Sequence, residues 1–268
     1  MNALAEEGAR LLGGSLSSSR SFAGGSLSHL VSIELTDGRS AIVKGGPTPR
    51  AEARMLEAIR GSGAPAPEVF AADDTVFVME IVEGDGSLSR AWASIGAAVR
   101  TLHAATGESY GWDCDFAFGA VEIPNGWSND WPRFWAENRL LNNGPHIPGN
   151  LASRIEKLAK GLADRLPAAP GASLLHGDLW SGNVMASGDR ITGLIDPACY
   201  YGHGEVDLAM LHLFGSPGAA FYAAYGELDP GYEDRRAIYT LWPALVHLRL
   251  FGSGYRGLVE RLLDQLGV

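Results

Sequence analysis

Three polar side chains between residues 174 and 210 each follow a short apolar segment, and this pattern restricts the fold more than any other feature of the chain. Asp178 follows an apolar pair that ends at Leu175, and Asn183 comes five positions later. Two further apolar segments, 184–185 and 191–195, predict a pair of short strands that ends at Asp196. The three side chains are therefore expected to leave neighbouring strand ends together.

The residue types at these three positions suit phosphoryl transfer. This reaction needs a carboxylate that orients and deprotonates the acceptor hydroxyl, and oxygen ligands that hold Mg²⁺ against the nucleotide phosphates. Asp178 fits the first role, and Asn183 and Asp196 fit the second. An Asp-x-x-x-x-Asn loop followed by a hairpin that ends in a second Asp has the spacing of the protein-kinase catalytic and metal loops, although Pro-Ala follows Asp196 here. A polar turn would explain any one of these residues, but not all three at this spacing.

The first part of the chain predicts the sheet and helix of a small lobe. Amphipathic spacing indicates a short packing helix over the first dozen residues. Strand-like segments at 30–35 and 41–44 follow, and the second ends at Lys44. A helix over 50–60 comes next and carries Glu52 in its first turn. This order predicts that Lys44 holds the α- and β-phosphates of ATP and that Glu52 fixes the lysine side chain.

A glycine turn lies between the first two predicted strands. Gly24, Gly25 and Ser26 follow the segment 15–22, whose serines suit either a first strand or a flexible linker. A glycine turn here lets backbone N–H groups approach phosphate oxygens without an intervening Cβ, and Ser26 adds a hydroxyl donor. We therefore expect this turn to cover the nucleotide phosphates, although adjacent glycines alone would equally suit a simple hairpin.

The small lobe is predicted to end with a strand pair at 68–70 and 75–82. This places a nucleotide-covering lobe at 1–83 and a catalytic and substrate lobe at 84–268. Adenine is expected to lie against the connecting strand, where backbone groups read it. The residues expected at that position are Met79, which equally suits the core, together with Glu80 and Val82.

The rest of the chain predicts a mainly helical lobe, so the predicted fold class is α+β. Its architecture is a two-lobed, protein-kinase-like fold, in which a small antiparallel-sheet lobe with one helix faces the larger helical lobe.

The segment 107–129 lacks periodicity, and its aromatic residues suit either a binding surface or small satellite cores. His103 is predicted to be a packing or capping residue, and His212 and His247 are predicted to be core histidines. Helices are predicted at 88–105, 151–166, 217–226, 232–251 and 255–266, and over the face that carries Trp131, Phe134, Trp135 and Asn138.

The letters around the three polar residues resemble the fructosamine kinase family, a branch of the kinase-like phosphotransferases that is related to aminoglycoside and choline kinases. HGDLWSGN at 176–183 and DPACYYGHGEVDLAM at 196–210 carry the resemblance, and the aromatic stretch from Pro124 to Leu140 extends it. The resemblance implies an ATP- and Mg²⁺-dependent ketosamine-3-kinase, which phosphorylates the third-carbon hydroxyl of a sugar adduct of an amine in a deglycation repair reaction. It also implies that His176 and Asp207 support the catalytic loop.

Trp180 stands two residues after the predicted base, in a loop that must face the acceptor. An indole can stack on the C–H face of a sugar and attract a protonated amine. We therefore predict that Trp180 contacts the ketosamine, although a tryptophan packed into the helical lobe would also fit this position.

Two rival functions share most of these features. A kinase acting on an aminoglycoside, choline or another amino alcohol would carry Asp178, Asn183 and Asp196. It would not need the four residues LWSG at 179–182, an insertion that the resemblance associates with fructosamine kinases. A non-catalytic nucleotide-binding member would be expected to lack at least one of the predicted catalytic side chains, and all are present here.

Composition limits the partners and the compartment. With 21 Lys and Arg against 31 Asp and Glu, the formal charge is -10, which repels nucleic acid and anionic membrane surfaces. The expected partner is instead a small-molecule ketosamine or a glycated amine, free or protein-bound, and the expected state is a monomer.

Cys114 and Cys199 lack metal-ligand spacing, and the first residues lack the basic start of a signal peptide. A cytoplasmic location is therefore predicted.

Overall fold

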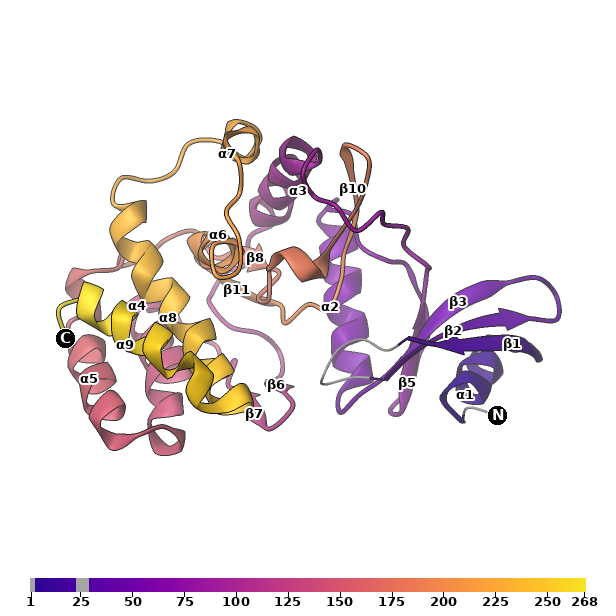
Figure 1. Ribbon diagram of the computed structural model, residues 1–268, viewed down its shortest axis with the longest axis horizontal. Coiled ribbons are helices and arrows are strands. Elements are labelled where there is room, and N and C mark those ends of the chain that lie inside the picture. Colours follow the sequence, from indigo (N-terminus) through magenta and orange to yellow (C-terminus); the bar gives the residue numbers. More distant parts are fainter. Residues whose placement is uncertain (1–2, 23–28) are drawn as a thin grey trace.

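The computed structural model describes residues 3–22 and 29–268, which form a sheet-bearing part and a larger helical part (Figure 1). The smaller part is a five-stranded sheet in the order β1-β2-β3-β5-β4, and every pair of neighbouring strands is antiparallel. This confirms the predicted antiparallel small lobe. Its strands are β1 (Leu16–Ser21), β2 (His29–Leu35), β3 (Ser40–Gly45), β4 (Val69–Ala72) and β5 (Val76–Met79).

The central strands of this sheet are buried on both faces. In β3, Val43 packs on the face covered by α1 (Ala3–Leu11), whereas Ile42 packs on the face covered by α2 (Pro49–Gly61). Successive strand residues alternate between faces, so a sheet covered on both sides requires a continuous apolar run. Gly8 lets α1 approach the sheet, because a Cβ there would lie 2.2 Å from a methyl carbon of Val43. The small lobe thus carries the two helices that the sequence predicted, the packing helix α1 and the Glu52-bearing helix α2.

The segment after β5 departs from the predicted boundaries. Strand β5 ends at Met79, and no regular element occurs before α3 (Trp92–Ala104), which begins later than predicted. Two hydrogen bonds connect this segment to the larger part. The Thr192 hydroxyl donates to the Glu83 carbonyl at 2.6 Å, and the Asp85 N–H donates to the Ala186 carbonyl at 2.9 Å. The division between 1–83 and 84–268 stays a prediction.

The larger part consists mainly of helices and also contains three short antiparallel strand pairs, β8–β11, β9–β10 and β6–β7 (Figure 1). The helix predicted at 151–166 ends at Lys160, because Gly161 interrupts it and only a 3₁₀ turn follows. Across residues 3–22 and 29–268, no helix combines the length and apolar character needed to cross a membrane. The elements are β6 (Phe116–Phe118), β7 (Val121–Ile123), α4 (Trp131–Phe134), η1 (Trp135–Leu140), η2 (Leu141–His146), α5 (Gly149–Lys160), η3 (Leu162–Asp164), β8 (Ser173–Leu175), η4 (Ser181–Asn183), β9 (Val184–Ser187), β10 (Arg190–Leu194), β11 (Tyr200–Gly202), α6 (Glu205–Leu211), α7 (Ala219–Tyr225), α8 (Tyr232–Phe251), η5 (Gly252–Tyr255) and α9 (Arg256–Gln265).

One apolar cluster joins the two parts. Met55 and Ile59 of α2 pack in the same cluster as Ile95 of α3 and Leu194 of β10. The backbone N–H of Cys199 also contacts the sulfur of Met55 at 3.3 Å. Helix α2, which carries Glu52, is therefore held against the segment after β10, which carries Asp196.

Candidate active site

The loop after β8 is held in shape by a buried carboxylate. Asp207, which is fully buried, accepts hydrogen bonds from the backbone N–H of His176 at 2.7 Å and of Gly177 at 3.0 Å. Gly177 has φ +78, and a Cβ there would lie 2.0 Å from the Ala198 carbonyl oxygen, so only glycine fits. His103 adds a third contact to Asp207 through its Nε2 at 3.1 Å. The predicted packing histidine is thus part of the network that shapes this loop.

His176 connects this loop to the strand that leads to Asp196. Its ring Nε2 lies 2.9 Å from the Ile195 carbonyl, which can only accept, and its Nδ1 then accepts the Asp178 N–H at 3.3 Å. Burial lowers the pKa of His176, which keeps the ring neutral and suits this tautomer. His176 and Asp207 therefore lie where the resemblance implied, beneath the loop that carries Asp178.

Asn183 and Asp178 contact each other directly. The Asn183 amide nitrogen donates to the Asp178 carboxylate at 2.9 Å and to its backbone carbonyl at 2.9 Å, which leaves the amide oxygen for another partner. Burial raises the pKa of Asp178 to about 7, and the nearby charge of Asp196 adds to this shift, while the hydrogen bond from Asn183 opposes it. Asp178 is thus a carboxyl group that titrates near neutrality.

Lys44 links the small lobe to Asp196. Its ammonium group forms an ion pair with Glu52 on α2 and a second one with Asp196 at 2.8 Å, and Lys44 itself is only 4% exposed. Burial acts to lower the pKa of Lys44, but the two carboxylates outweigh it and hold that pKa above its ordinary value. Glu57, the other glutamate of α2, is exposed. The Lys44–Glu52 pair that the sequence predicted is present.

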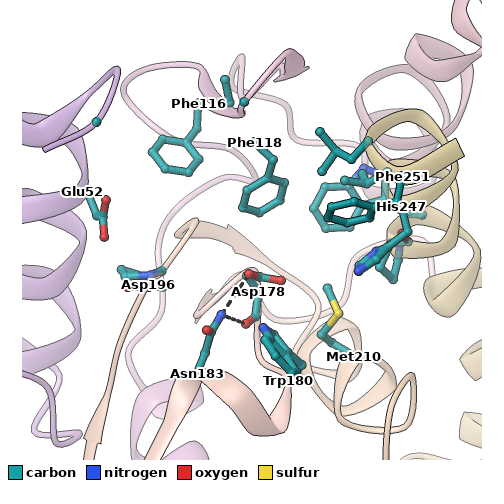
Figure 2. A pocket seen from close by; sticks show the side chains of 18 of the residues that line it. Glu52, Phe116, Phe118, Asp178, Trp180, Asn183, Asp196, Met210, His247 and Phe251 are labelled. Atoms are coloured by element: carbon teal, nitrogen blue, oxygen red, sulfur yellow. Dashed lines mark hydrogen bonds between the residues drawn. The ribbon is translucent and has the colours of Figure 1, made fainter. Parts of the chain in front are cut away.

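Asp196 adopts an unusual backbone conformation. Its φ is +55, the left-handed region, and it is the one non-glycine residue with positive φ in the described ranges 3–22 and 29–268. Such a conformation is costly for a residue with a Cβ and is common at functional sites. Here it places the carboxylate next to Lys44 at the edge of a cavity (Figure 2).

Six of the predicted site residues line a cavity of about 590 Å³: Lys44, Glu52, Asp178, Trp180, Asn183 and Asp196. Glu52 and Asp196 lie on one side of it, Asp178, Asn183 and Trp180 lie near its middle, and aromatic side chains close the other side (Figure 2). Trp180 is 36% exposed and meets Phe214 edge-on at 5.8 Å. Its ring therefore faces the cavity rather than the core of the helical part.

Some predicted nucleotide residues are not among the described residues that line this cavity. Met79 is buried in the core, and the Glu80 N–H donates to the Glu68 carbonyl at 2.8 Å, so this N–H is not available to adenine. Gly24, Gly25 and Ser26 lie outside the described residues. The adenine and phosphate-loop assignments accordingly stay predictions.

The sequence missed part of the aromatic side of the cavity. Phe116 and Phe118 line it from the β6–β7 pair, within the segment whose aromatic residues suited either a binding surface or a satellite core. His247 was predicted as a core histidine, but it is half-buried and also lines the cavity. The apolar face of α8 gave no local signal for this, because core and cavity-lining positions have the same helical spacing.

The antiparallel lobe, the Lys–Glu pair and the Asp–Asn–Asp arrangement define the class of protein as a kinase-like, ATP-dependent phosphotransferase. Comparison with known proteins gives the family. The sequence pattern of the fructosamine kinase family matches residues 13–267, so the chain belongs to that family.

Individual relatives are similar over most of the chain. A probable ketoamine kinase of Synechocystis sp. is 37% identical over 81% of this chain and 77% of its own length. A chloroplastic protein-ribulosamine 3-kinase of Arabidopsis thaliana is 35% identical over 70% of this chain and 60% of its own length. The crystal structure of a candidate fructosamine-3-kinase from Thermobifida fusca superposes with a TM-score of 0.91 at 31% identity and covers 100% of both chains.

Proposed function

We propose that this chain transfers the γ-phosphoryl group of ATP to the third-carbon hydroxyl of a ketosamine, in a deglycation repair reaction. The observation that carries the proposal is the position of Asp178 in the middle of the cavity, between the Lys44–Asp196 pair and the aromatic side. Relatives named as ketoamine and ribulosamine kinases support the choice of acceptor.

The side chains have distinct roles in this proposal. Lys44, fixed by Glu52, neutralises phosphate charge at one end of the cavity. The acceptor hydroxyl donates its hydrogen bond to Asp178, and its proton passes to that carboxylate as the new oxygen–phosphorus bond forms and the bond to ADP breaks. Trp180 stacks on the sugar. His176 and Asp207 keep Asp178 in place through the contacts described above.

Asn183 and Asp196 fit a Mg²⁺ ion. Both line the cavity, and both offer the oxygen atoms that this hard cation prefers. The amide nitrogen of Asn183 is engaged by Asp178, so its oxygen is the atom left for the metal. When bound, Mg²⁺ supplies positive charge that offsets the charge of the nucleotide phosphates.

A substrate screen tests the proposal. Purified protein with ATP and Mg²⁺ is assayed for ADP release against fructose and ribulose adducts of one amine, an aminoglycoside and choline, and phosphorus NMR locates the product phosphate. The Asp178→Asn variant is the control: it should bind ATP as the wild type does but lose about 100-fold or more in kcat. Turnover of choline or the aminoglycoside with inert ketosamines would overturn the assignment.

A further inference from the structure

The two ends of the cavity differ sharply in charge. Lys44, Glu52, Asp178 and Asp196 carry its charged groups, and Figure 2 shows Glu52 and Asp196 on one side and Phe251 on the other. The opposite end is an apolar wall, which we define as the side chains of Phe118, Phe214, Trp242, Val246, Phe251 and Tyr255.

Parts of the apolar wall are exposed to an unusual degree. Phe214 is 46% exposed and Phe251 is 49% exposed, although both are large apolar side chains. They come from different elements, the loop after α6 and the end of α8, and converge on one cavity. Exposed apolar side chains that gather in a concave site are typical of ligand-binding surfaces.

The wall is also uncharged near neutral pH. His247 lies beside it, with its ring centroid 5.1 Å from that of Phe214, 5.4 Å from that of Phe251 and 4.9 Å from that of Tyr255. Its Nδ1 donates to the Pro243 carbonyl at 2.8 Å, and burial lowers its pKa, so the ring is neutral. The wall therefore offers apolar and aromatic contact, with no formal charge to pair with a charged ligand group.

The order of groups along the cavity determines what meets this wall. The phosphoryl donor belongs at the Lys44 end, and the acceptor hydroxyl belongs at Asp178. In a ketosamine the third carbon is separated by one carbon from the carbon that carries the amine, so the amine and its substituent lie beside the reacting hydroxyl. The other end of the sugar carries only hydroxyl groups, which an apolar wall would leave without partners.

From this arrangement we propose that the acceptor is a small-molecule ketosamine whose amine carries an apolar group, aromatic or branched aliphatic, and that this group packs against the apolar wall. The inference rests on the proposed ketosamine kinase activity and specifies its substrate class. A free glycated lysine would bring an α-ammonium and a carboxylate toward a wall that offers neither a charged partner, so its end gains less contact there than an apolar group does. The protein therefore selects its acceptor by the amine as well as by the sugar.

The test compares ketosamines that share one sugar and differ in the amine. The probes are the adducts of phenethylamine, of isoamylamine and of the lysine side chain, with the free lysine α-groups left charged. We expect kcat/KM for the phenethylamine and isoamylamine adducts to exceed that for the lysine adduct by about tenfold or more, the usual scale for apolar discrimination in a pocket. Phe251→Ala should raise KM for the phenethylamine adduct by about tenfold and leave KM for the lysine adduct and for ATP within about twofold.

A matched control separates contact from general loss of surface. Phe70 on β4 is 44% exposed, a fraction similar to the 49% of Phe251, and is not among the described residues that line the cavity. Phe70→Ala should therefore leave KM for the phenethylamine adduct, for the lysine adduct and for ATP unchanged. Phe214→Ala, in a different element, repeats the test if Phe251→Ala does not fold.

The outcomes distinguish the two proposals. If no ketosamine is phosphorylated, the proposed function itself fails. If the lysine adduct is used as well as or better than the apolar adducts, or if Phe251→Ala and Phe214→Ala affect all adducts equally, the ketosamine kinase assignment stands and the apolar-amine inference is wrong.

Discussion

Asp207→Asn should both destabilise the protein and slow catalysis, because this carboxylate shapes the loop that carries Asp178. In the wild type, each Asp207 oxygen accepts one backbone N–H, from His176 at 2.7 Å and from Gly177 at 3.0 Å. Asparagine keeps one acceptor oxygen, but its NH₂ group then faces the second N–H. One buried backbone donor is left without an acceptor.

The magnitude follows from the burial of this group. Asp207 is 0% exposed, so water cannot replace the lost acceptor. Leaving a buried donor unsatisfied and losing a hydrogen bond to a charged group together cost about 2–4 kcal/mol. The loop would also shift to relieve the contact between the two donors, and a displacement of about 1 Å at Asp178 can cost about 100-fold in rate.

Urea unfolding and steady-state kinetics test both parts, with Asp85→Asn as the matched control. Asp85 also accepts two backbone N–H bonds, from Ser87 at 3.0 Å and from Gly188 at 2.9 Å, but it is exposed and distant from the loop of Asp178 in the chain. Its substitution should cost less stability and leave kcat unchanged. An Asp207→Asn protein as stable and as active as the Asp85→Asn protein would refute the reasoning, and lost stability with normal kcat would refute the positioning role alone.

Three further predictions concern metal, acceptor and pH. Asp196→Ala should weaken Mg²⁺-ATP binding in calorimetry more than Asn183→Ala does, because the aspartate supplies a charged oxygen and the asparagine a neutral one; equal affinities would contradict the metal assignment. Trp180→Ala should raise KM for a ketosamine several-fold, since a stacked ring contributes about 0.5–2 kcal/mol, while KM for ATP stays the same; a parallel loss of thermal stability and of both affinities would favour a packing role. In metal-free protein, Asp178 keeps its proton up to about pH 7 when folded and loses it near its ordinary pKa of about 3.9 when unfolded. The unfolding free energy of the wild type should therefore fall relative to Asp178→Asn as pH rises from 5 to 7 and level off above it, and a difference that does not change with pH in urea titrations would exclude the shift.

Local sequence patterns predicted β2 and α2 well because each of these elements has a simple period. The alternation of apolar residues in β2 and the helical spacing in α2 both follow from which faces are buried. Glu52 and Lys44 could be paired from sequence because a strand followed directly by a helix leaves few arrangements for the two ends. The same reasoning located Asp178 and Asp196, since both stand where short apolar segments end.

The boundaries and the acceptor side were less predictable because they depend on contacts between distant segments. The start of α3 at Trp92 and the irregular connection before it reflect contacts with β9 and β10, such as that of Thr192 with Glu83. His247 has the helical spacing of a core residue, and its position in the cavity is set by the loop after α6 and by Phe214. Nothing within one helix distinguishes these two environments.

Arg139 shows why the aromatic side of the cavity could not be derived from local pattern. It is fully buried, and its guanidinium packs against aromatic rings: it lies 4.1 Å from the Tyr200 ring centroid and 5.2 Å from that of Trp242. It also donates to the Pro124 carbonyl at 2.6 Å and to the Asn125 side chain at 2.7 Å. These bonds fix the end of the segment that carries β6 and β7, and Trp242 itself lines the cavity. An arginine in a helical segment is ordinarily expected at the surface. Its contacts, and the packing of Phe118 against Trp242 at a ring-centroid distance of 6.4 Å, join segments far apart in the sequence and so cannot be derived from any one of them.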